Sequence, residues 1–316
     1  MKIFYKKFKK CPYCNSKINL KYSGLTDRLE TVHGEFNIYE CTKCKLAFTN
    51  PLPVKNLGIL YPTNYLTVKS KKANTLDFER WYRFDQYKFD FGIVKKYISK
   101  EINDFGSYLD VGCGSGERVE YVKQNGCKES YGLDKFDNLK SKNKNIFNSN
   151  ILAFKPKKKY EVVSLFHVLE HIENFEEVIK HIKKNILAEN GYLIIQVPNY
   201  ESLERKIFKD RWFCFDVPRH LWHFNVDFLK AFLENNGLKC LGYKIENAIF
   251  HPVSIGASIF KDIDIQRIWV LSKPAHYKIL WILVTILTIP FSWIENLLNG
   301  SSMLTLVFKL KGKILI

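Results

Sequence analysis

Short apolar runs alternate with amphipathic segments through the middle of the chain. The runs YLDV, SYGLD, YEVVSLFHV and YLIIQV have the composition of buried strands. Between them, apolar residues three and four positions apart predict helices over 116–126 and 175–191, closed by Gly126 and Gly191. This alternation predicts a doubly wound, mostly parallel sheet with helices on both faces. Ligands of such sheets lie at the carboxyl ends of the strands.

Three further patterns flank this block. Upstream, a stripe at helical spacing predicts a helix that packs on the core, or alternatively a lid over a ligand: Leu76, Trp81, Phe84, Tyr87, Phe91 and Val94. Residues 46–66, rich in proline and asparagine, predict an irregular connector. Downstream, KCLGYKIEN and SSMLTLVFKLK predict two more strands, the last one antiparallel at the sheet edge or inserted near it.

Residues 248–299 contain the most apolar stretch of the chain. The run Ile279–Ile294 has 16 residues without a charge, fewer than the about 20 that a spanning helix needs, and Pro290 interrupts it. A single crossing would also carry the last strand across the bilayer, away from its partners. We therefore expect a hydrophobic membrane-associating helical hairpin, or alternatively a soluble subdomain or dimer interface. The expected headgroup contacts are Trp269, Trp281, Trp293, Lys273 and Lys278.

Two cysteine pairs with C-x2-C spacing lie near the N-terminus: Cys11 with Cys14, and Cys41 with Cys44. Each pair aims two thiolates at one point, and two such turns form a tetrahedral site that suits structural zinc. Four thiolates leave no coordination position for a substrate, so we expect a structural metal rather than a catalytic one. The alternative is four unrelated buried cysteines, which the repeated spacing disfavours. The other cysteines are scattered and predict inert packing: Cys113, Cys127, Cys214 and Cys240.

Composition adds the class of partner. With 49 Lys and Arg against 32 Asp and Glu, the formal charge is +17, which favours an anionic partner. No arginine-rich tract singles out nucleic acid, so an anionic membrane surface is the stronger hypothesis. The first ten residues lack the apolar core of a signal peptide. We therefore expect a cytoplasmic protein that is peripherally or monotopically associated with the inner membrane face.

The turn DVGCGSGE follows the first strand of the central block and predicts the kind of nucleotide bound. A dinucleotide fingerprint would have its third glycine where Glu117 stands, and a P-loop would need Gly-Lys-Ser/Thr. Asp110 and Glu117 flank the turn, with no basic residue before Arg118, so a positively charged ligand is favoured over a pyrophosphate. Asp134 ends the next strand, where such folds bind ribose hydroxyls. The pattern predicts a phosphate-free nucleoside with a positive centre.

These motifs, D-V-G-C-G-S-G with the downstream G-L-D and FHVLEHI, resemble those of class I S-adenosylmethionine-dependent methyltransferases. The CPYC and CTKC pairs followed by LAFTNPLP are similar to the zinc-ribbon front of one branch of that family. Many members of that branch serve surface-polysaccharide or lipid biosynthesis. The resemblance implies S-adenosylmethionine as cofactor and a structural zinc ion.

The resemblance also implies roles for individual residues. The glycines would let the backbone approach the cofactor, Asp110 would support its methionine end, and Asp134 would bind the ribose. Phe166 and His167 would line the adenosyl and methyl region, and Asn150 stands where the family often has an acid near the adenine amino group. The implied cofactor-binding set is Asp110, Gly112, Gly114, Gly116, Asp134, Asn150, Phe166 and His167.

Methyl transfer from a sulfonium needs an aligned nucleophile, and a hydroxyl acceptor also benefits from a base that titrates near neutrality. Histidine is the natural candidate. We predict His220, His223 and His167 as catalytic residues, the first two in the segment RWFCFDVPRHLWHFN. The alternative for His223 is packing beside a helix cap at Asn225. For Glu170 and His171 we expect a structural pair under the cofactor.

The predicted fold class is α/β: a Rossmann-like, doubly wound, mostly parallel seven-stranded sheet with a small zinc ribbon and a hydrophobic insert before the last strand. The predicted domains are 1–60 for the ribbon and connector, 75–247 plus 300–316 for cofactor binding, and 248–299 for the insert. The predicted enzyme O-methylates a lipid-linked or surface-glycan acceptor at the membrane. Rival hypotheses are a quinone or lipid methyltransferase, an RNA-associated methyltransferase and a degenerate cofactor-binding scaffold.

Overall fold

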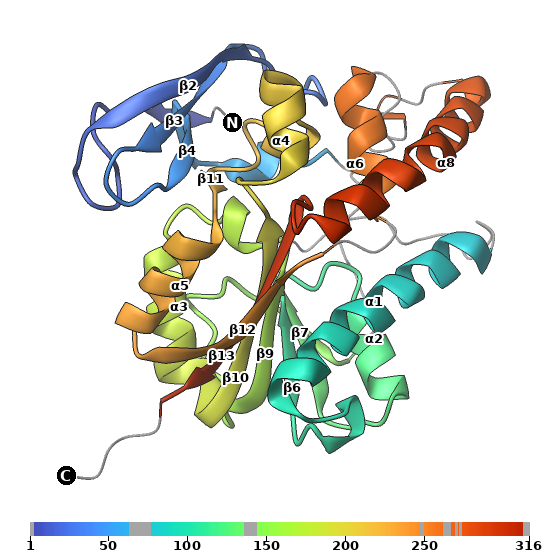
Figure 1. The fold of residues 1–316 in the computed structure, drawn as a ribbon. Coiled ribbons are helices and arrows are strands. Elements are labelled where there is room, and N and C mark those ends of the chain that lie inside the picture. Colours follow the sequence, from blue (N-terminus) through green and yellow to red (C-terminus); the bar gives the residue numbers. More distant parts are fainter. Residues whose placement is uncertain are drawn as a thin grey trace.

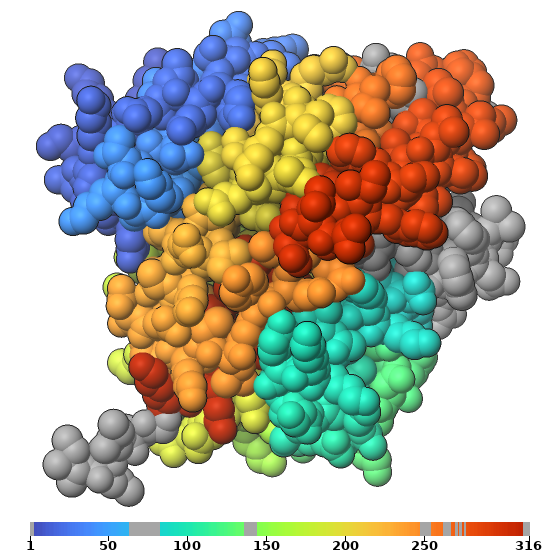
Figure 2. All heavy atoms as spheres, viewed as in Figure 1, coloured from blue at the N-terminus to red at the C-terminus, as the bar shows by residue number. Residues whose placement is uncertain are grey.

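The computed structural model describes residues 3–62, 77–135, 144–246, 250–261, 267–268, 271 and 274–311. A large sheet lies between two groups of helices, and a small sheet and a helical pair lie at the edge where its parallel strands end (Figure 1). Figure 2 shows the small sheet, α4 (Leu203–Phe208) and the helical pair side by side over that end of the molecule. The predicted α/β class is confirmed.

The large sheet has seven strands in the order β12-β13-β10-β9-β6-β7-β8. Its strands run parallel except β13, which is antiparallel to both neighbours and therefore inserted between them. The predicted position of the last strand is confirmed. The bounds are β6 (Tyr108–Val111), β7 (Ser130–Asp134), β8 (Ile146–Asn148), β9 (Tyr160–Phe166), β10 (Leu187–Pro198), β12 (Leu238–Ile245) and β13 (Met303–Leu310).

Two hydrophobic clusters cover the two faces of this sheet. One packs under α3 (Phe175–His181) and α5 (Val226–Asn235), and the other under α1 (Asp77–Ile98) and α2 (Glu117–Gln124). From the predicted upstream stripe, Phe84, Tyr87, Phe91 and Val94 pack in the second cluster, which confirms core packing. Leu76 and the side chain of Trp81 lie outside the described residues. Short 3-10 turns lie at Leu57–Leu60, Ile102–Asp104, Leu169–His171, Lys209–Arg211 and Phe213–Phe215.

The helix predicted over 175–191 is too long. After α3 the chain makes one π turn, Ile182–Ile186, and then enters β10 at Leu187. Asn190 has a left-handed φ of 59°, and a Cβ at Gly191 would lie 2.9 Å from the carbonyl oxygens of Ala188 and Glu161. Gly191 therefore permits an irregularity within β10 rather than ending a helix, and the register of β10 against β9 shifts at this place.

The N-terminal part forms a small antiparallel sheet in the order β11-β4-β3-β2. Its strands are β2 (Ile18–Leu25), β3 (Phe36–Cys41), β4 (Ala47–Asn50) and β11 (Trp222–His223). The predicted irregular connector is partly wrong, because it contains β4 and β5 (Leu52–Lys55), which pairs with β1 (Phe4–Lys6). Tyr13, between the first two cysteines, packs edge-on against Phe228 and Phe232 of α5 and so holds the cysteine turns against the helices of the large sheet.

The apolar insert contains α6 (Phe250–Ile259) and α8 (Ala275–Leu297), which pack against each other. Their approach is close, since a Cβ at Gly256 would lie 2.8 Å from Val284. Pro290 lies inside α8 without ending it, so the predicted interruption is wrong. One helix in the described part of the chain, His276–Leu297, is long and apolar enough to cross a membrane. Trp269 and Lys273, expected at headgroups, lie outside the described residues.

Candidate cofactor and acceptor site

The glycine turn joins β6 to α2 through three left-handed residues. Gly112, Gly114 and Gly116 have φ values of 72°, 53° and 81°, and Gly116 is the N-cap of α2. A side chain is excluded at Gly112, because its Cβ would lie 2.4 Å from Cγ2 of Val168. Gly112 therefore has no room for a side chain, because Val168 of the loop after β9 fills the space. The left-handed conformation of all three residues also favours glycine.

Two acids reach this turn from adjacent strands. Asp110, at the end of β6, is buried and accepts a hydrogen bond of 2.7 Å from the hydroxyl of Ser164. Burial raises the pKa of Asp110, and nearby Arg118 opposes that shift. Asp134, the last residue of β7, accepts a hydrogen bond of 3.0 Å from the Gly114 N–H through Oδ2. Both acids thus lie where the sequence predicted, one under the turn and one beside it.

Helix α1 contributes two groups that the sequence analysis did not single out, Asp90 and Arg83, which pair with residues of α2. Arg118 turns inward, pairs with the buried Asp90 at 2.8 Å and lies 3.6 Å from the ring centroid of Phe166. Arg83 pairs with Glu117. Arg83 therefore partly neutralises Glu117, and Arg118 partly neutralises Asp110. The local sequence did not indicate these pairs, because Arg83 and Asp90 are far from the turn along the chain.

The remaining predicted cofactor residues lie at the ends of β8 and β9. Asn150 is exposed just after β8, and its Oδ1 accepts a hydrogen bond of 2.9 Å from the Leu152 N–H. Phe166 is buried as the last residue of β9. His167 follows with an exposed side chain and a φ of 55°. A left-handed φ is strained for histidine, and such strain is concentrated at functional sites.

A histidine cluster lies next to His167. The rings of His171 and His220 are 4.6 Å apart, and the buried Glu170 lies beside them. Burial lowers the pKa of His171 to about 4, and His220 adds to this shift. Burial opposes ionisation of Glu170, but His167 and the two other histidines outweigh it and lower the pKa of this carboxyl. The predicted simple pair of Glu170 and His171 is therefore part of a larger cluster that includes predicted His220.

Two other predicted residues of this segment are buried. His223 lies in β11 with 3% of its surface exposed, and its Nε2 is 3.2 Å from the Thr49 hydroxyl. Burial holds the pKa of His223 well below its usual value. Asn225 caps α5 by accepting a hydrogen bond of 2.8 Å from the Phe228 N–H. Arg219, in the same segment, is fully buried and paired with Asp27 and Asp216.

A family model described as "Methyltransferase domain" matches residues 84–242, half of the chain. The chain belongs to this methyltransferase family. An uncharacterized protein of Methanocaldococcus jannaschii is 28% identical to the methyltransferase over 115 residues, which are 35% of this chain and 45% of that relative. The match therefore spans less than half of the relative's length.

Solved structures with a similar fold include two methyltransferases. One is an S-adenosylmethionine-dependent methyltransferase from Archaeoglobus fulgidus, with 19% identity, a TM-score of 0.46, and coverage of 74% of this chain and 100% of that chain. The other is magnesium protoporphyrin IX methyltransferase from Synechocystis with bound S-adenosylhomocysteine, with 12% identity, a TM-score of 0.45, and coverage of 76% and 90%. At these scores the activity class depends on the family match and the turn, not on these structures.

The residues at the turn fit the cofactor of this family, S-adenosylmethionine, which supplies an electrophilic methyl group. Three left-handed glycines let the backbone of the turn face a ligand directly, and the acids at its edges suit a cationic sulfonium rather than a pyrophosphate. The methyltransferase is therefore an S-adenosylmethionine-dependent enzyme. The role of each predicted residue toward this cofactor remains a prediction.

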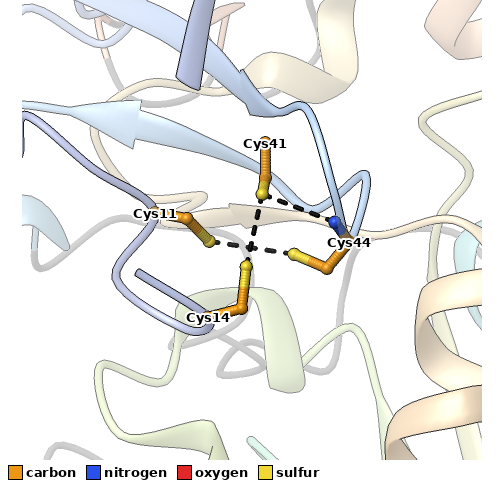
Figure 3. A group of neighbouring side chains, drawn as sticks. All are labelled: Cys11, Cys14, Cys41 and Cys44. Atoms are coloured by element: carbon orange, nitrogen blue, oxygen red, sulfur yellow. Dashed lines mark hydrogen bonds between the residues drawn. The ribbon is translucent and has the colours of Figure 1, made fainter. Parts of the chain in front are cut away.

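The four cysteines of the ribbon converge on one point (Figure 3). Sγ of Cys11 lies 3.7 Å from that of Cys44, and Sγ of Cys14 lies 3.4 Å from that of Cys41. Four thiolates about 2.3 Å from a central zinc ion are separated by about 3.8 Å, so the arrangement is compatible with zinc. The backbone N–H groups of Lys43 and Cys44 both donate to Sγ of Cys41 at 3.4 Å. Such bonds stabilise a thiolate ligand.

Proposed function

We propose that this methyltransferase transfers a methyl group to a hydroxyl of a lipid-linked or surface-glycan acceptor at the cytosolic face of a membrane. S-adenosylmethionine supplies the methyl group as an electrophile. The observation that carries the membrane part of the proposal is the inverted polarity of α8. The division into a ribbon over 1–60, a cofactor-binding domain over 75–247 plus 300–316 and an insert over 248–299 belongs to the same proposal.

Three polar side chains of α8, Thr288, Ser292 and Glu295, face inward. Ser292 and Glu295 are buried, whereas Leu287, Trp293 and Leu297 are 77%, 70% and 82% exposed. A surface helix in water has the opposite arrangement, with apolar residues toward the core. The Ser292 hydroxyl donates to the carbonyl of Ile289 within the helix at 2.9 Å, so it needs no water. An outward face of leucine, isoleucine and tryptophan suits the interfacial region of a bilayer.

The insert and the cofactor turn lie at the same edge of the sheet. β12 ends at Ile245, which pairs with Leu304 at the start of β13, so the insert leaves and re-enters the sheet at its carboxyl edge. The glycine turn follows β6 at that edge. Because β12 and β6 run in the same direction, a membrane that contacts α8 lies on the active-site side of the molecule. A lipid-linked acceptor would need this placement, and the charge of +17 adds attraction to anionic lipid.

The catalytic roles follow from the site. Asp110 and Asp134 with the three glycines hold the cofactor, Asn150 and Phe166 line its adenosyl part, and His167 lies next to the methyl region. The acceptor hydroxyl lies near His220, whose half-buried ring shares the space after β9 with His171. Alignment and exclusion of water supply most of the catalysis in such a displacement, and a base adds roughly 10²–10⁴-fold for a hydroxyl.

The cysteine cluster has a structural role in this proposal. A ribbon held by zinc provides β4, on which β11 of the large domain pairs through Trp222 and His223. The segment with His220 precedes β11 directly, so the ribbon fixes one wall of the acceptor region. Cys11, Cys14, Cys41 and Cys44 would hold the zinc ion.

Vesicle flotation and methyl transfer test the proposal together. The full chain is mixed with vesicles of phosphatidylcholine and phosphatidylglycerol, in low and high salt, and separately with labelled S-adenosylmethionine and a membrane extract. We expect flotation that persists in high salt and label in the lipid-linked fraction. Leu283→Asp should abolish flotation, whereas Leu20→Asp should not; these leucines are 52% and 53% exposed, on α8 and β2.

The opposite outcomes overturn the proposal. Equal flotation of the Leu283→Asp and Leu20→Asp variants would remove α8 from the membrane contact. A wild-type dimer in light scattering that Leu283→Asp dissociates, without any flotation, would assign the apolar face to a second copy of the chain. Label recovered only in RNA or only in quinone would replace the acceptor class.

A further inference from the structure

Three potential metal ligands from two distant segments meet beside the exposed His167. Glu170 and His171 lie in the 3-10 turn after β9, and His220 lies just before β11. One ligand atom from each lies within 4.8 Å of the others. The Leu221 N–H donates to the Glu170 carbonyl at 2.8 Å, so the backbone fixes the two segments to each other.

Both histidines are held in one tautomer. Nδ1 of His171 is 2.9 Å from the carbonyl oxygen of Arg219 and 3.0 Å from the hydroxyl oxygen of Tyr61. Nδ1 of His220 is 2.7 Å from the carbonyl oxygen of Cys214. A carbonyl only accepts, so each Nδ1 carries the hydrogen and each Nε2 keeps its lone pair. Histidines that bind metals are oriented by this kind of bond, from the other ring N–H to a backbone carbonyl.

The carboxylate of Glu170 is buried without a hydrogen bond from the described residues, although His167 lies within ion-pair distance. Its residue is 0% exposed, and neither oxygen has a hydrogen bond to any residue that the structure describes. Nδ1 of His167 lies 3.7 Å from Oε1, beyond hydrogen-bond distance. A buried charge without hydrogen bonds costs several kcal/mol, so such a group requires an ordered water, a bound ion or a functional role.

We propose that Glu170, His171 and His220 form a binding site for a divalent transition-metal cation. Two imidazoles and one carboxylate are a ligand set for zinc, iron and manganese that leaves coordination positions open. An open position distinguishes this site from the four-cysteine cluster, whose ligands fill a tetrahedron. This site is independent of zinc in the ribbon.

The role of the cation depends on the proposed function, because it concerns the acceptor. An acceptor hydroxyl that binds the open position has a lowered pKa and releases its proton to solvent. The oxygen then forms the bond to the methyl carbon, the carbon–sulfur bond breaks, and its electron pair stays on sulfur. In this arrangement His220 positions the acceptor through the cation, and no separate general base is needed.

Metal content and manganese binding test the site without cofactor or acceptor. The full chain is incubated with zinc chloride, desalted and assayed for zinc by mass spectrometry. In a separate sample, the metal-free chain receives one equivalent of zinc, which the thiolates select, and free Mn²⁺ is then followed by electron paramagnetic resonance, since imidazole–carboxylate sites accept manganese. We expect two zinc ions per chain, and one Mn²⁺ bound when the ribbon is loaded with zinc. His220→Asn and Glu170→Gln should retain one zinc and lose Mn²⁺ affinity by roughly tenfold or more.

His181→Asn is the matched control. His181 is also half-buried, and its Nε2 bonds to the Phe154 carbonyl at 2.8 Å on a different part of the molecule. This variant should keep two zinc ions. Retention of one zinc and of S-adenosylhomocysteine binding shows that a variant is folded; if Glu170→Gln fails this criterion, His220→Asn decides.

The proposal is overturned if the wild type binds one zinc and no Mn²⁺, or if the His220→Asn variant binds both as the wild type does. Because neither readout uses methyl transfer, its failure leaves the proposed acceptor and membrane contact untouched. Conversely, failure of flotation or methyl transfer leaves the metal count interpretable.

Discussion

Replacement of Gly112 by alanine perturbs the cofactor turn at its tightest point. A φ of 72° costs a residue with a Cβ about 1–2 kcal/mol. The new Cβ would also lie 2.4 Å from Cγ2 and 3.1 Å from Cγ1 of Val168, and such overpacking costs about 1–3 kcal/mol. We therefore expect Gly112→Ala to lower the free energy of unfolding by about 2–5 kcal/mol, and the melting temperature by roughly 4–10 °C.

Thermal unfolding measures the loss of stability. Calorimetry with S-adenosylhomocysteine measures the loss of cofactor affinity that we expect when the turn is distorted. Gly92→Ala is the control, because Gly92 lies within α1 with nothing within 4 Å of its Cβ position, and alanine there should add about 0.5–1 kcal/mol. The double variant Gly112→Ala/Val168→Ala should regain cofactor binding in part, since it removes the overlap but not the strain. A Gly112→Ala protein with wild-type stability and affinity would refute the reasoning.

Three further outcomes follow from the buried charges and the ribbon. Arg219→Met should lower the free energy of unfolding in urea by about 3–5 kcal/mol, because Asp27 and Asp216 stay buried without their cation. Burial opposes ionisation of Asp216, but Arg219 outweighs it and lowers the pKa to about 2. The stability from this group is therefore complete above the unfolded pKa of about 3.9 and lost as pH falls toward about 2, and Asp216→Asn should flatten that loss in acid titrations. Cys14→Ser should remove the ribbon zinc and expose β2 and β3 to limited proteolysis.

Each of these has its own control and contrary result. Arg219→Lys keeps the charge and should lose less stability than the methionine variant; equal stability of wild type and Arg219→Met would show that the ion triad contributes nothing. If the free energy of unfolding of Asp216→Asn falls as steeply with decreasing pH as that of the wild type, other carboxyls cause the acid sensitivity. Cys240→Ser, outside the ribbon, should keep the ribbon zinc and resist proteolysis. If Cys240→Ser is cleaved as fast as Cys14→Ser, the metal does not stabilise the ribbon fold.

Local patterns predicted the elements of the sheet well. The runs at 108–111 and 130–134 are β6 and β7 to the residue, because buried parallel strands are continuous apolar runs bounded by turns. The early start of β10 was missed, since Gly191 resembles a helix end and the pairing of Leu187 with Tyr160 is a tertiary contact. The strands β4 and β5 were missed for the same reason: Pro51 and Pro53 suggest a loop, and only pairing partners reveal the strands.

The candidate site was predictable where its spacing is local. The glycine turn and the cysteine pairs have fixed short spacings, and the structure brings the members of each together. The cluster of Glu170, His171 and His220 was not predicted as a unit, because about 50 residues separate its halves and only tertiary contacts, such as the bond from the Leu221 N–H to the Glu170 carbonyl, bring them together. The pairing of Arg118 with Asp90 was missed likewise, since a helix upstream of the turn supplies the acid.

Calorimetry of the full chain with S-adenosylhomocysteine is the most direct test of the cofactor assignment on which the account depends. We expect one binding site per chain, with at least a tenfold weaker affinity in Asp134→Ala, whose carboxylate adjoins the turn at Gly114. Heat from NADH together with none from S-adenosylhomocysteine would contradict the account.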